Sequence, residues 1–292
     1  MRNPIQLWLL LALILGSVLV GCQVKGKTSE EQNRPARQRI VSLNGTFTEI
    51  IFEIGIGNQV VGVDVTSTYP AAELADVPRI GHNRNISAEG VLALAPDLII
   101  GRAGELKPEV EAQLKASGVS IMLLPQEYTV EGSKRLIQEV CEALGYADKA
   151  ESMIRQIDKD LAQVKPLDPE KSALFIYARG TGTLMVAGEN TQMQQIIALA
   201  GAKNAISGFE KFKPLSAEAL VEANPDVILL FSSGLNSLEG PSGLLNVPGI
   251  AETKAGKDKA FISMDGQLLS GFGPRVGQAI RELNEAFQGT SP

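Results

Sequence analysis

The sequence predicts an α/β protein of two lobes, each with a central, mostly parallel sheet flanked by helices, joined by one long backbone helix. Short apolar runs alternate with helical patterns through both halves of the chain, which is typical of parallel α/β sheets. A helical pattern of more than four turns separates the halves at 148–164. A segment at 86–100 is also echoed at 215–229, each matching pair lying 129 positions apart.

Each strand expected in the first half is a short apolar run, and the helices between the strands begin near capping or turn residues. The loop at 64–78 is unusually long for a connection inside a compact domain, which indicates that it has a function. The strands are expected at 40–43, 60–63, 98–101 and 119–124, and the helices at 46–54, 88–94, 108–117 and 130–144.

The helical pattern at 148–164 favours a rigid connector between two lobes, although a surface helix of one lobe is nearly as compatible. The expected division is a first lobe at 39–147, a connecting helix at 148–166 and a second lobe at 167–292. In the second lobe, strands are expected at 173–177, 184–186, 227–231 and 260–262, and helices at 192–200 and 273–287.

The first 21 residues have the pattern of a secretion signal, with Arg2 followed by an apolar run at 7–20 that is too short to be a comfortable transmembrane helix. The run ends in Leu19-Val20-Gly21-Cys22, which resembles the lipobox of bacterial lipoproteins. That resemblance implies cleavage before Cys22, acylation of its thiol and residence outside the cytoplasm on a membrane face. The alternatives are an uncleaved anchor or a chance Gly-Cys pair. Residues 22–38 are polar and charged, as in a flexible tether.

The composition argues against several classes of function. A net charge of −6 gives no electrostatic reason to expect nucleic-acid binding. One histidine and two cysteines leave little material for a histidine-based triad or a zinc site. Paired carboxylates for hydrolysis remain open, but no pair stands out in a loop, so an enzyme is the weaker hypothesis and we expect none. Cys141 falls on an apolar helical face and is expected to be a buried small hydrophobe.

The internal echo carries a repeated Ser-Ala-Glu sequence at the start of a helix. Ser87 and Ser216 can cap the two helices, and Glu89 and Glu218 then lie in the first turns, where the helix dipole favours an acid. Capping alone would explain both copies.

Taken together, several motifs resemble the substrate-binding proteins of bacterial ABC importers for haem, within the two-lobed class that also takes up cobalamin and iron-siderophores. The resemblance extends over 39–287. The motifs are Arg39-Ile40-Val41-Ser42-Leu43, Gly62-Val63-Asp64 with Thr66-Ser67-Thr68-Tyr69-Pro70, Gly81 to Gly90, Met185-Val186-Ala187-Gly188, Lys213 to Leu220, and Gly271-Phe272-Gly273-Pro274-Arg275.

This resemblance implies a monomeric lipoprotein that captures haem between its lobes and delivers it to a membrane permease driven by an ATPase. The alternative within the same class is a cobalamin or ferric-siderophore carrier, and the alternative outside it is an extracytoplasmic hydrolase that uses carboxylates. Similar proteins present a glutamate from each lobe to arginines of the permease. Glu89 and Glu218 match those positions, which implies a docking role beyond capping.

The usual iron ligand of the family is a tyrosine that follows the glycine of a Gly-Tyr-Met-Arg stretch. This sequence has Gly81-His82-Asn83-Arg84 instead, so the resemblance implies an imidazole ligand, which is also a good ligand for haem iron. Tyr69 in the preceding loop is the weaker alternative, as an iron ligand or as a hydrogen-bond partner of a propionate.

Several further residues are expected near the haem carboxylates, in the shell around the iron or at the rim of the cleft. Arg84 could pair with a propionate or orient the ligand through its planar guanidinium group. Arg179 is a second candidate partner for a propionate, and Tyr177 or Met185 is a remote candidate for the sixth ligand. Arg275 is expected to stabilise the start of the last helix or the rim of the cleft.

Overall fold

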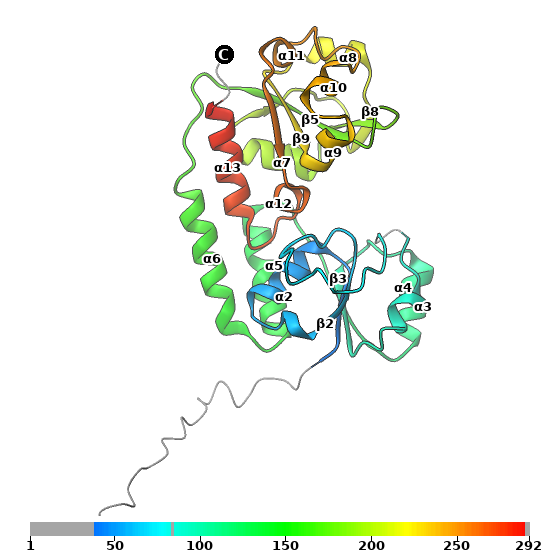
Figure 1. The fold of residues 1–292 in the computed structure, drawn as a ribbon. Coiled ribbons are helices and arrows are strands. Elements are labelled where there is room, and N and C mark those ends of the chain that lie inside the picture. The colour runs from blue at the N-terminus through cyan, green and yellow to red at the C-terminus, as the bar shows by residue number, and fades with distance from the viewer. Residues whose placement is uncertain (1–37, 83–84, 290–292) are drawn as a thin grey trace, which may run out of the picture. The chain divides into compact units, whose positions relative to one another are not determined.

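The structure is a computed structural model in which residues 38–82 and 85–289 are described. The predicted signal peptide, Cys22, nearly all of the tether and Arg84 therefore lie outside the described residues. The described chain forms two sheets with their helices, one in each lobe (Figure 1). No helix in this part of the chain has the length and apolar character needed to cross a membrane.

The first lobe is built on a fully parallel sheet with the strand order β2-β1-β3-β4. Its central strands are buried because helices cover both faces, and this explains why they read as continuous apolar runs. The strands are β1 (Ile40–Ser42), β2 (Val60–Val63), β3 (Leu98–Arg102) and β4 (Ser120–Leu124), and the helices are α2 (Gly45–Glu53), the short η2 (Gly57–Gln59), α3 (Ala88–Leu92), α4 (Pro108–Ala116) and α5 (Val130–Ala143).

The second lobe has a mixed sheet with the order β10-β9-β5-β6-β8, and β7 pairs with β5. Strands β10, β9 and β5 are parallel, whereas β6 and β8 run antiparallel to their neighbours. The strands are β5 (Ser172–Ala178), β6 (Leu184–Ala187), β7 (Lys203–Asn204), β8 (Phe212–Pro214), β9 (Val227–Phe231) and β10 (Phe261–Met264). The helices are α7 (Gln192–Leu199), α8 (Ala217–Ala223), α9 (Ser232–Ser237), α10 (Pro241–Leu245), α11 (Lys254–Asp258), α12 (Gly266–Ser270) and α13 (Val276–Gly289).

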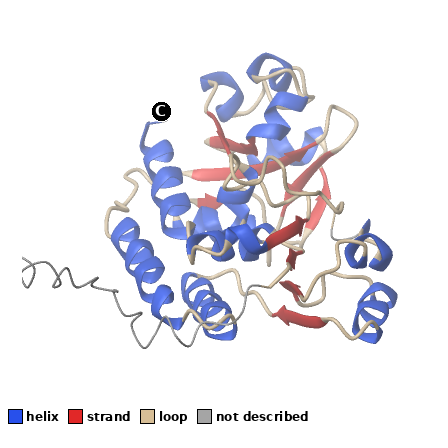
Figure 2. Cartoon of the chain, turned by 60° about the horizontal axis from the view of Figure 1, so that its bottom comes forward, coloured by secondary structure: helices blue, strands red, loops and turns tan. Residues whose placement is uncertain are grey.

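The long helix between the lobes is α6 (Ala147–Leu161), which packs against α5 on one side and α13 on the other. Figures 1 and 2 show α6 and α13 side by side at one side of the two lobes. The helices approach closely because position 277 is glycine: a Cβ atom there would lie 2.6 Å from the carbonyl oxygen of Ile157. One hydrophobic cluster runs from Ile40 of β1 through α5, α6 and α13 to Phe175 of β5. A shared core of this kind resists sliding of one lobe against the other.

The predicted α/β architecture and the predicted caps are confirmed. Ser87 accepts a hydrogen bond from the amide of Gly90 at 3.1 Å, and Ser216 accepts one from Ala219 at 3.2 Å. The sequence missed the shortest elements, η2, β7, β8 and α9 to α12, because segments of two to six residues carry too little periodicity to detect.

Candidate functional site

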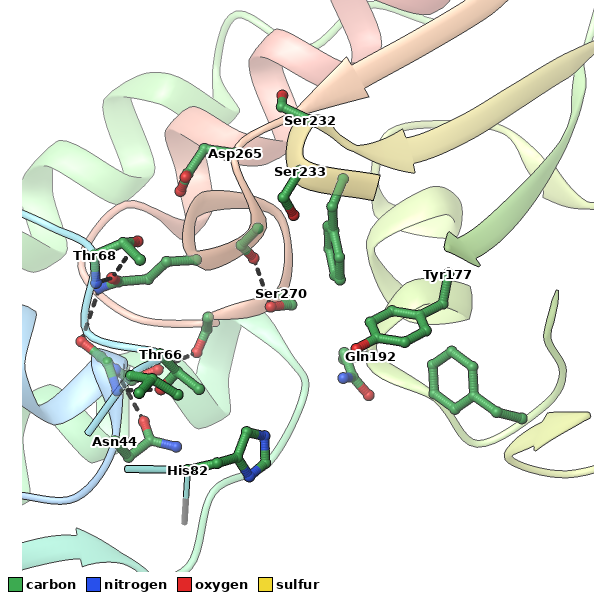
Figure 3. A pocket seen from close by; sticks show the side chains of 18 of the residues that line it. Asn44, Thr66, Thr68, His82, Tyr177, Gln192, Ser232, Ser233, Asp265 and Ser270 are labelled. Carbon is green, nitrogen blue, oxygen red and sulfur yellow. Dashed lines mark hydrogen bonds between the residues drawn. The ribbon is translucent and has the colours of Figure 1, made fainter. Parts of the chain in front are cut away.

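A cavity of about 1160 Å³ lies between the two lobes, and residues of both sheets line it. Figure 3 shows His82 entering it from the first lobe and Tyr177 from the second. The predicted ligand histidine and two predicted second-lobe residues, Tyr177 and Arg179, are therefore brought to one cavity. The candidate sixth ligand Met185 also lines it.

The first-lobe wall is polar, and its charged and polar side chains are largely paired with one another. Arg102 lies 3.0 Å from Glu105, and it also donates to the hydroxyl of Tyr128. Glu105 also accepts a hydrogen bond from Asn44 at 3.0 Å. Because its charge is balanced within this wall, Arg102 is a poor free partner for an incoming anion.

His82 lies on a short stretch, residues 79–82, which we call the His82 arm. Ile80 donates a hydrogen bond to the carbonyl of Val63 at 2.9 Å, and this bond joins the arm to the end of β2. Gly81 has a φ of +98°, a conformation that favours glycine because it lacks a Cβ atom. The turn at Gly81 directs the half-buried imidazole into the cavity lining.

The second-lobe wall offers an aromatic surface. The rings of Tyr177 and Phe231 meet edge to face with their centroids 6.2 Å apart, and Phe231 packs in the same way on the buried Phe175 at 4.8 Å. Phe212 extends this surface and packs on Phe175 at 6.5 Å. Such a wall suits a large planar ligand with delocalised electrons.

Two cationic side chains line the same wall. The guanidinium of Arg179 lies 5.5 Å from the centre of the Tyr177 ring, and Lys211 lines the cavity next to Phe212. No carboxylate of the described residues forms an ion pair with either cation. The acids that line the cavity are already engaged, since Glu105 binds Arg102 and Asp265 caps α12 through the amide of Leu268 at 2.9 Å. The wall therefore has two positive charges to offer to a ligand.

Tyr69, the predicted alternative ligand, is not among the residues that line the cavity. Its ring lies under the guanidinium of Arg275, with 3.6 Å between the guanidinium carbon and the ring centre. Arg275 also pairs with the buried Glu49 at 2.9 Å, so it makes a contact between the lobes. Arg84 cannot be placed, because it lies outside the described residues.

The two repeated glutamates are exposed and lie away from the cavity lining. Glu89 occupies the first turn of α3 and Glu218 the first turn of α8. Neither carboxylate has an ion-pair partner in the described part of the chain. Both are therefore accessible to a second protein.

Sequence reasoning missed Lys211 and the aromatic residues around it. In an extended strand, alternate side chains would put Lys211 and Phe212 on opposite faces. Lys211 instead has a φ of +64°, which breaks the alternation and lets both side chains line the cavity. No pattern in the sequence marks this left-handed residue, since it is neither glycine nor asparagine.

Comparison with known proteins identifies the family. The family model described as "Periplasmic binding protein" matches residues 40–268. The chain belongs to this family. Its predicted resemblance to two-lobed substrate-binding proteins is thus confirmed, and the family's members bind substrates for transport.

Three relatives illustrate the range of this family. The periplasmic heme-binding protein RhuT from Roseiflexus sp. RS-1, solved in apo form, is 41% identical with a TM-score of 0.84; the match covers 87% of this chain and 99% of that one. An uncharacterized ABC transporter substrate-binding lipoprotein of Bacillus subtilis (strain 168), YvrC, is 28% identical over 86% of this chain and 80% of its own length. A vitamin B12-binding protein of Pectobacterium carotovorum is 26% identical over 87% of this chain and 90% of its own.

Proposed function

We propose that this protein is the extracytoplasmic substrate-binding component of an ABC importer and that its ligand is haem. The observation that carries the proposal is the pairing of two different walls across one cavity. An imidazole enters from one lobe, and an aromatic surface with two unpaired cations, Arg179 and Lys211, faces it from the other. Haem has the matching features: iron that accepts imidazole, a planar aromatic ring and two carboxylates.

The competing ligands fit these walls less well. Cobalamin carries neutral amides around its ring and one phosphate in its nucleotide loop, so it offers a single anionic group to the two cations Arg179 and Lys211. A hexadentate ferric siderophore already fills all six positions around its iron and leaves none for His82. The greater similarity to RhuT, at 41% identity against 26% for the vitamin B12-binding protein, points the same way.

A carboxylate-based hydrolase is also disfavoured. It would need two carboxyl groups free to act as acid and base on a substrate. Glu105 and Asp265 are the acids that line the described cavity, and each is held by contacts within its own lobe. We therefore propose binding and hand-over without catalysis.

In this proposal His82 is the iron ligand, and the aromatic wall stacks on the ring. Arg179 and Lys211 pair with the propionates, and the Tyr177 ring stabilises the guanidinium of Arg179 by a cation–π contact. Arg84, two residues after His82, remains a proposed propionate partner. Tyr69 could ligate iron only after its ring leaves Arg275, so it stays the weaker candidate.

We further propose that a lipid on Cys22 holds the protein on a membrane face and that residues 22–38 tether it there. Glu89 and Glu218 would dock one lobe each to arginines of the permease, which an ATPase drives. The proposed division into lobes is 39–147 and 167–292, with 148–166 as the connector, and the proposed docking acids fall one in each lobe.

A haemin titration of the mature chain tests the proposal. We expect a sharp Soret band at saturation, and we expect His82→Ala to weaken haem binding by at least about tenfold because an iron ligand is lost. Tyr69→Phe is the matched control, since it removes a phenol close to the cavity and should leave the band unchanged. A normal band in His82→Ala together with a weakened one in Tyr69→Phe would transfer the ligand role to Tyr69. The absence of any haem band in the unaltered protein would refute the haem assignment.

A further inference from the structure

The side chain of Gln267 in α12 makes five hydrogen bonds, all of them to residues of the first lobe. Its Oε1 accepts from the amide and hydroxyl of Thr68, at 2.6 and 3.0 Å, and from the amide of Tyr69 at 2.9 Å. Its Nε2 donates to the carbonyl of Gly45 at 2.8 Å and to Glu49 at 3.2 Å. Only one orientation of the amide satisfies both sets of partners. The side chain is 9% exposed, so these bonds are sheltered from water.

Around Gln267, residues 265–275 form a segment that belongs to the second-lobe chain and lies on the first lobe. We call it the return segment. The carbonyl of Gly271 accepts hydrogen bonds from the hydroxyl of Thr46 and the amide of Gln126, each at 2.6 Å. The ring of Phe272 packs edge to face on Tyr128, with 5.4 Å between ring centres. The return segment is thus fixed to the wall of the cavity from which His82 projects.

Thr68 and Tyr69 end a loop, residues 64–69, which we call the β2 loop and which is held as one unit by Asp64. The Asp64 carboxylate is fully buried and accepts from the amide and hydroxyl of Thr66, at 3.0 and 2.6 Å, and from the hydroxyl of Ser67 at 2.7 Å. A loop closed by its own buried carboxylate moves as a body when one end is displaced.

The β2 loop in turn holds the His82 arm. The amide of Val65 donates to the carbonyl of Gly81, the residue directly before His82, at 3.0 Å. Arg79 donates to the carbonyl of Ser67 and, at 3.3 Å, to that of Asp64. An unbroken series of hydrogen bonds therefore leads from Gln267 through the β2 loop to the backbone that carries the imidazole.

We propose that Gln267 is a positioning residue for His82: the return segment, acting through Gln267 and the β2 loop, sets where the first lobe presents its only imidazole. Any displacement of α12 relative to the first lobe then alters the geometry at His82. The consequence for ligand affinity rests on the proposed function, whereas the position of the imidazole does not.

The single histidine of the chain gives a direct readout without any ligand. In the mature chain, produced without a histidine tag, the Cε1–Hε1 cross-peak in a ¹H–¹³C NMR spectrum belongs to His82 alone. We expect Gln267→Met, which keeps the side-chain volume but removes both hydrogen-bonding ends, to shift or broaden this cross-peak. An unchanged cross-peak in a folded Gln267→Met protein would overturn the proposal.

The matched control is Asn284→Leu. Asn284 is another buried amide, 1% exposed, which bonds the backbone of Lys165 and Ala200 and has no link to the β2 loop. It should leave the His82 cross-peak in place. If Gln267→Met does not fold, Asp64→Asn interrupts the same series at the β2 loop, and it should shift the cross-peak. A wild-type cross-peak in Asp64→Asn would equally count against the proposal.

A haemin titration then separates the two proposals. If the unaltered protein binds haem and His82→Ala weakens binding, Gln267→Met should weaken haem binding by about tenfold, as is common when the residues that orient a metal ligand are changed. Wild-type affinity in Gln267→Met would refute the positioning role and leave the haem assignment intact. If the unaltered protein binds no haem, the assignment fails, and the NMR comparison still decides whether Gln267 positions His82.

Discussion

At the scale of single residues, the cavity depends on side chains whose direction is set by local backbone geometry. The turn at Gly81 brings His82 into the cavity, and the left-handed backbone of Lys211 brings its ammonium beside Phe212. Two positions further on, Lys213 leaves the cavity lining and lies 4.6 Å from the centre of the Phe209 ring. Two lysines of the same strand region therefore have different environments, and only one of them can meet a ligand in the cavity.

This difference predicts that Lys211→Met weakens haem binding and that Lys213→Met does not. An exposed ion pair contributes about 0.2–1 kcal/mol, so we expect a loss of about two- to fivefold at low salt. The measurement is a haemin titration of both variants. It is repeated with haemin dimethyl ester, in which the carboxylates are blocked and the effect of Lys211→Met should disappear. An equal loss with the ester would show that Lys211 acts by packing.

The residue scale also shows what the sequence could predict at the site. His82 could be found because its glycine neighbour and a family motif mark the position in the linear sequence. Lys211 could not, since its role depends on a backbone conformation that its own residue type does not favour. Likewise, Arg275 was assigned to the helix start or the cleft rim, but its partner Glu49 lies 226 residues away and no local pattern connects the two.

At the scale of elements, the internal echo repeats a strand connection as well as a capped helix. Asp97 directly precedes β3 and accepts a hydrogen bond at 2.8 Å from the amide of Arg39, which precedes β1. Asp226 directly precedes β9 and accepts two bonds at 2.8 Å, from the amide and hydroxyl of Ser172 at the start of β5. The repeated Pro-Asp pair thus joins the starts of two parallel strands in each lobe. The sequence predicted the caps of this echo, but not the role of its aspartates, because strand pairing is a long-range contact.

The second of these aspartates predicts a pH dependence of stability. Burial tends to raise the pKa of Asp226, but hydrogen bonds from Lys254 and Ser172 outweigh it, and the net pKa is lowered. A carboxyl whose pKa is lower in the folded state stabilises the fold above its unfolded pKa, about 3.9, and loses this contribution as the pH falls through the folded pKa.

We therefore expect Asp226→Asn to cost about 1 kcal/mol of unfolding free energy at about pH 7, through loss of charge-assisted hydrogen bonds. The difference from the unaltered protein should shrink below about pH 4. Urea unfolding at a series of pH values measures it. Asp258→Asn, an exposed acid on α11, should change stability by less than about 0.5 kcal/mol throughout. A penalty for Asp226→Asn that is the same at every pH would contradict the assignment.

At the scale of the whole molecule, the lobes are joined by the α6–α13 contact and by the return segment. The first supplies the shared hydrophobic cluster, and the second supplies buried polar contacts, including the Arg275–Glu49 pair at 2.9 Å. Burial raises the pKa of the Glu49 carboxyl, and the guanidinium of Arg275 opposes that rise. The α/β class and the connector could be predicted from periodicity. These polar contacts between the lobes could not, because they join residues that are far apart in the sequence.

Removing one partner of the Arg275–Glu49 pair should lower the free energy of unfolding. Arg275→Met leaves Glu49 as an uncompensated buried charge, and we expect a loss of about 3–5 kcal/mol in unfolding free energy at neutral pH. The loss should be smaller at acidic pH, because a carboxyl with a raised pKa favours the folded state when protonated and disfavours it as the pH rises. Adding Glu49→Gln to Arg275→Met should restore part of the stability, and a urea-unfolding double-mutant cycle measures the coupling. Additive losses would mean that the two residues act independently.

The proposed hand-over of ligand engages both lobes at once, through Glu89 on α3 and Glu218 on α8. Ser87 and Ser216 already cap these helices, so replacing each glutamate by glutamine removes a charge and leaves the caps intact. The lost helix-dipole interaction costs only about 0.3–1 kcal/mol per site. Since both acids lie outside the cavity lining, haem affinity should stay at the wild-type value.

Uptake should respond differently from binding. With the cognate permease and ATPase in proteoliposomes, we expect the double variant Glu89→Gln and Glu218→Gln to lower haem uptake by at least about tenfold, because a charge pair buried at an interface is worth about 2 kcal/mol or more. Glu109→Gln is the matched control, since Glu109 is an exposed acid in the first turn of α4 and has no counterpart in the echo. Each single variant should show an intermediate rate if the two lobes dock together. Wild-type uptake by the double variant would leave capping and dipole stabilisation as the only roles of the repeated glutamates.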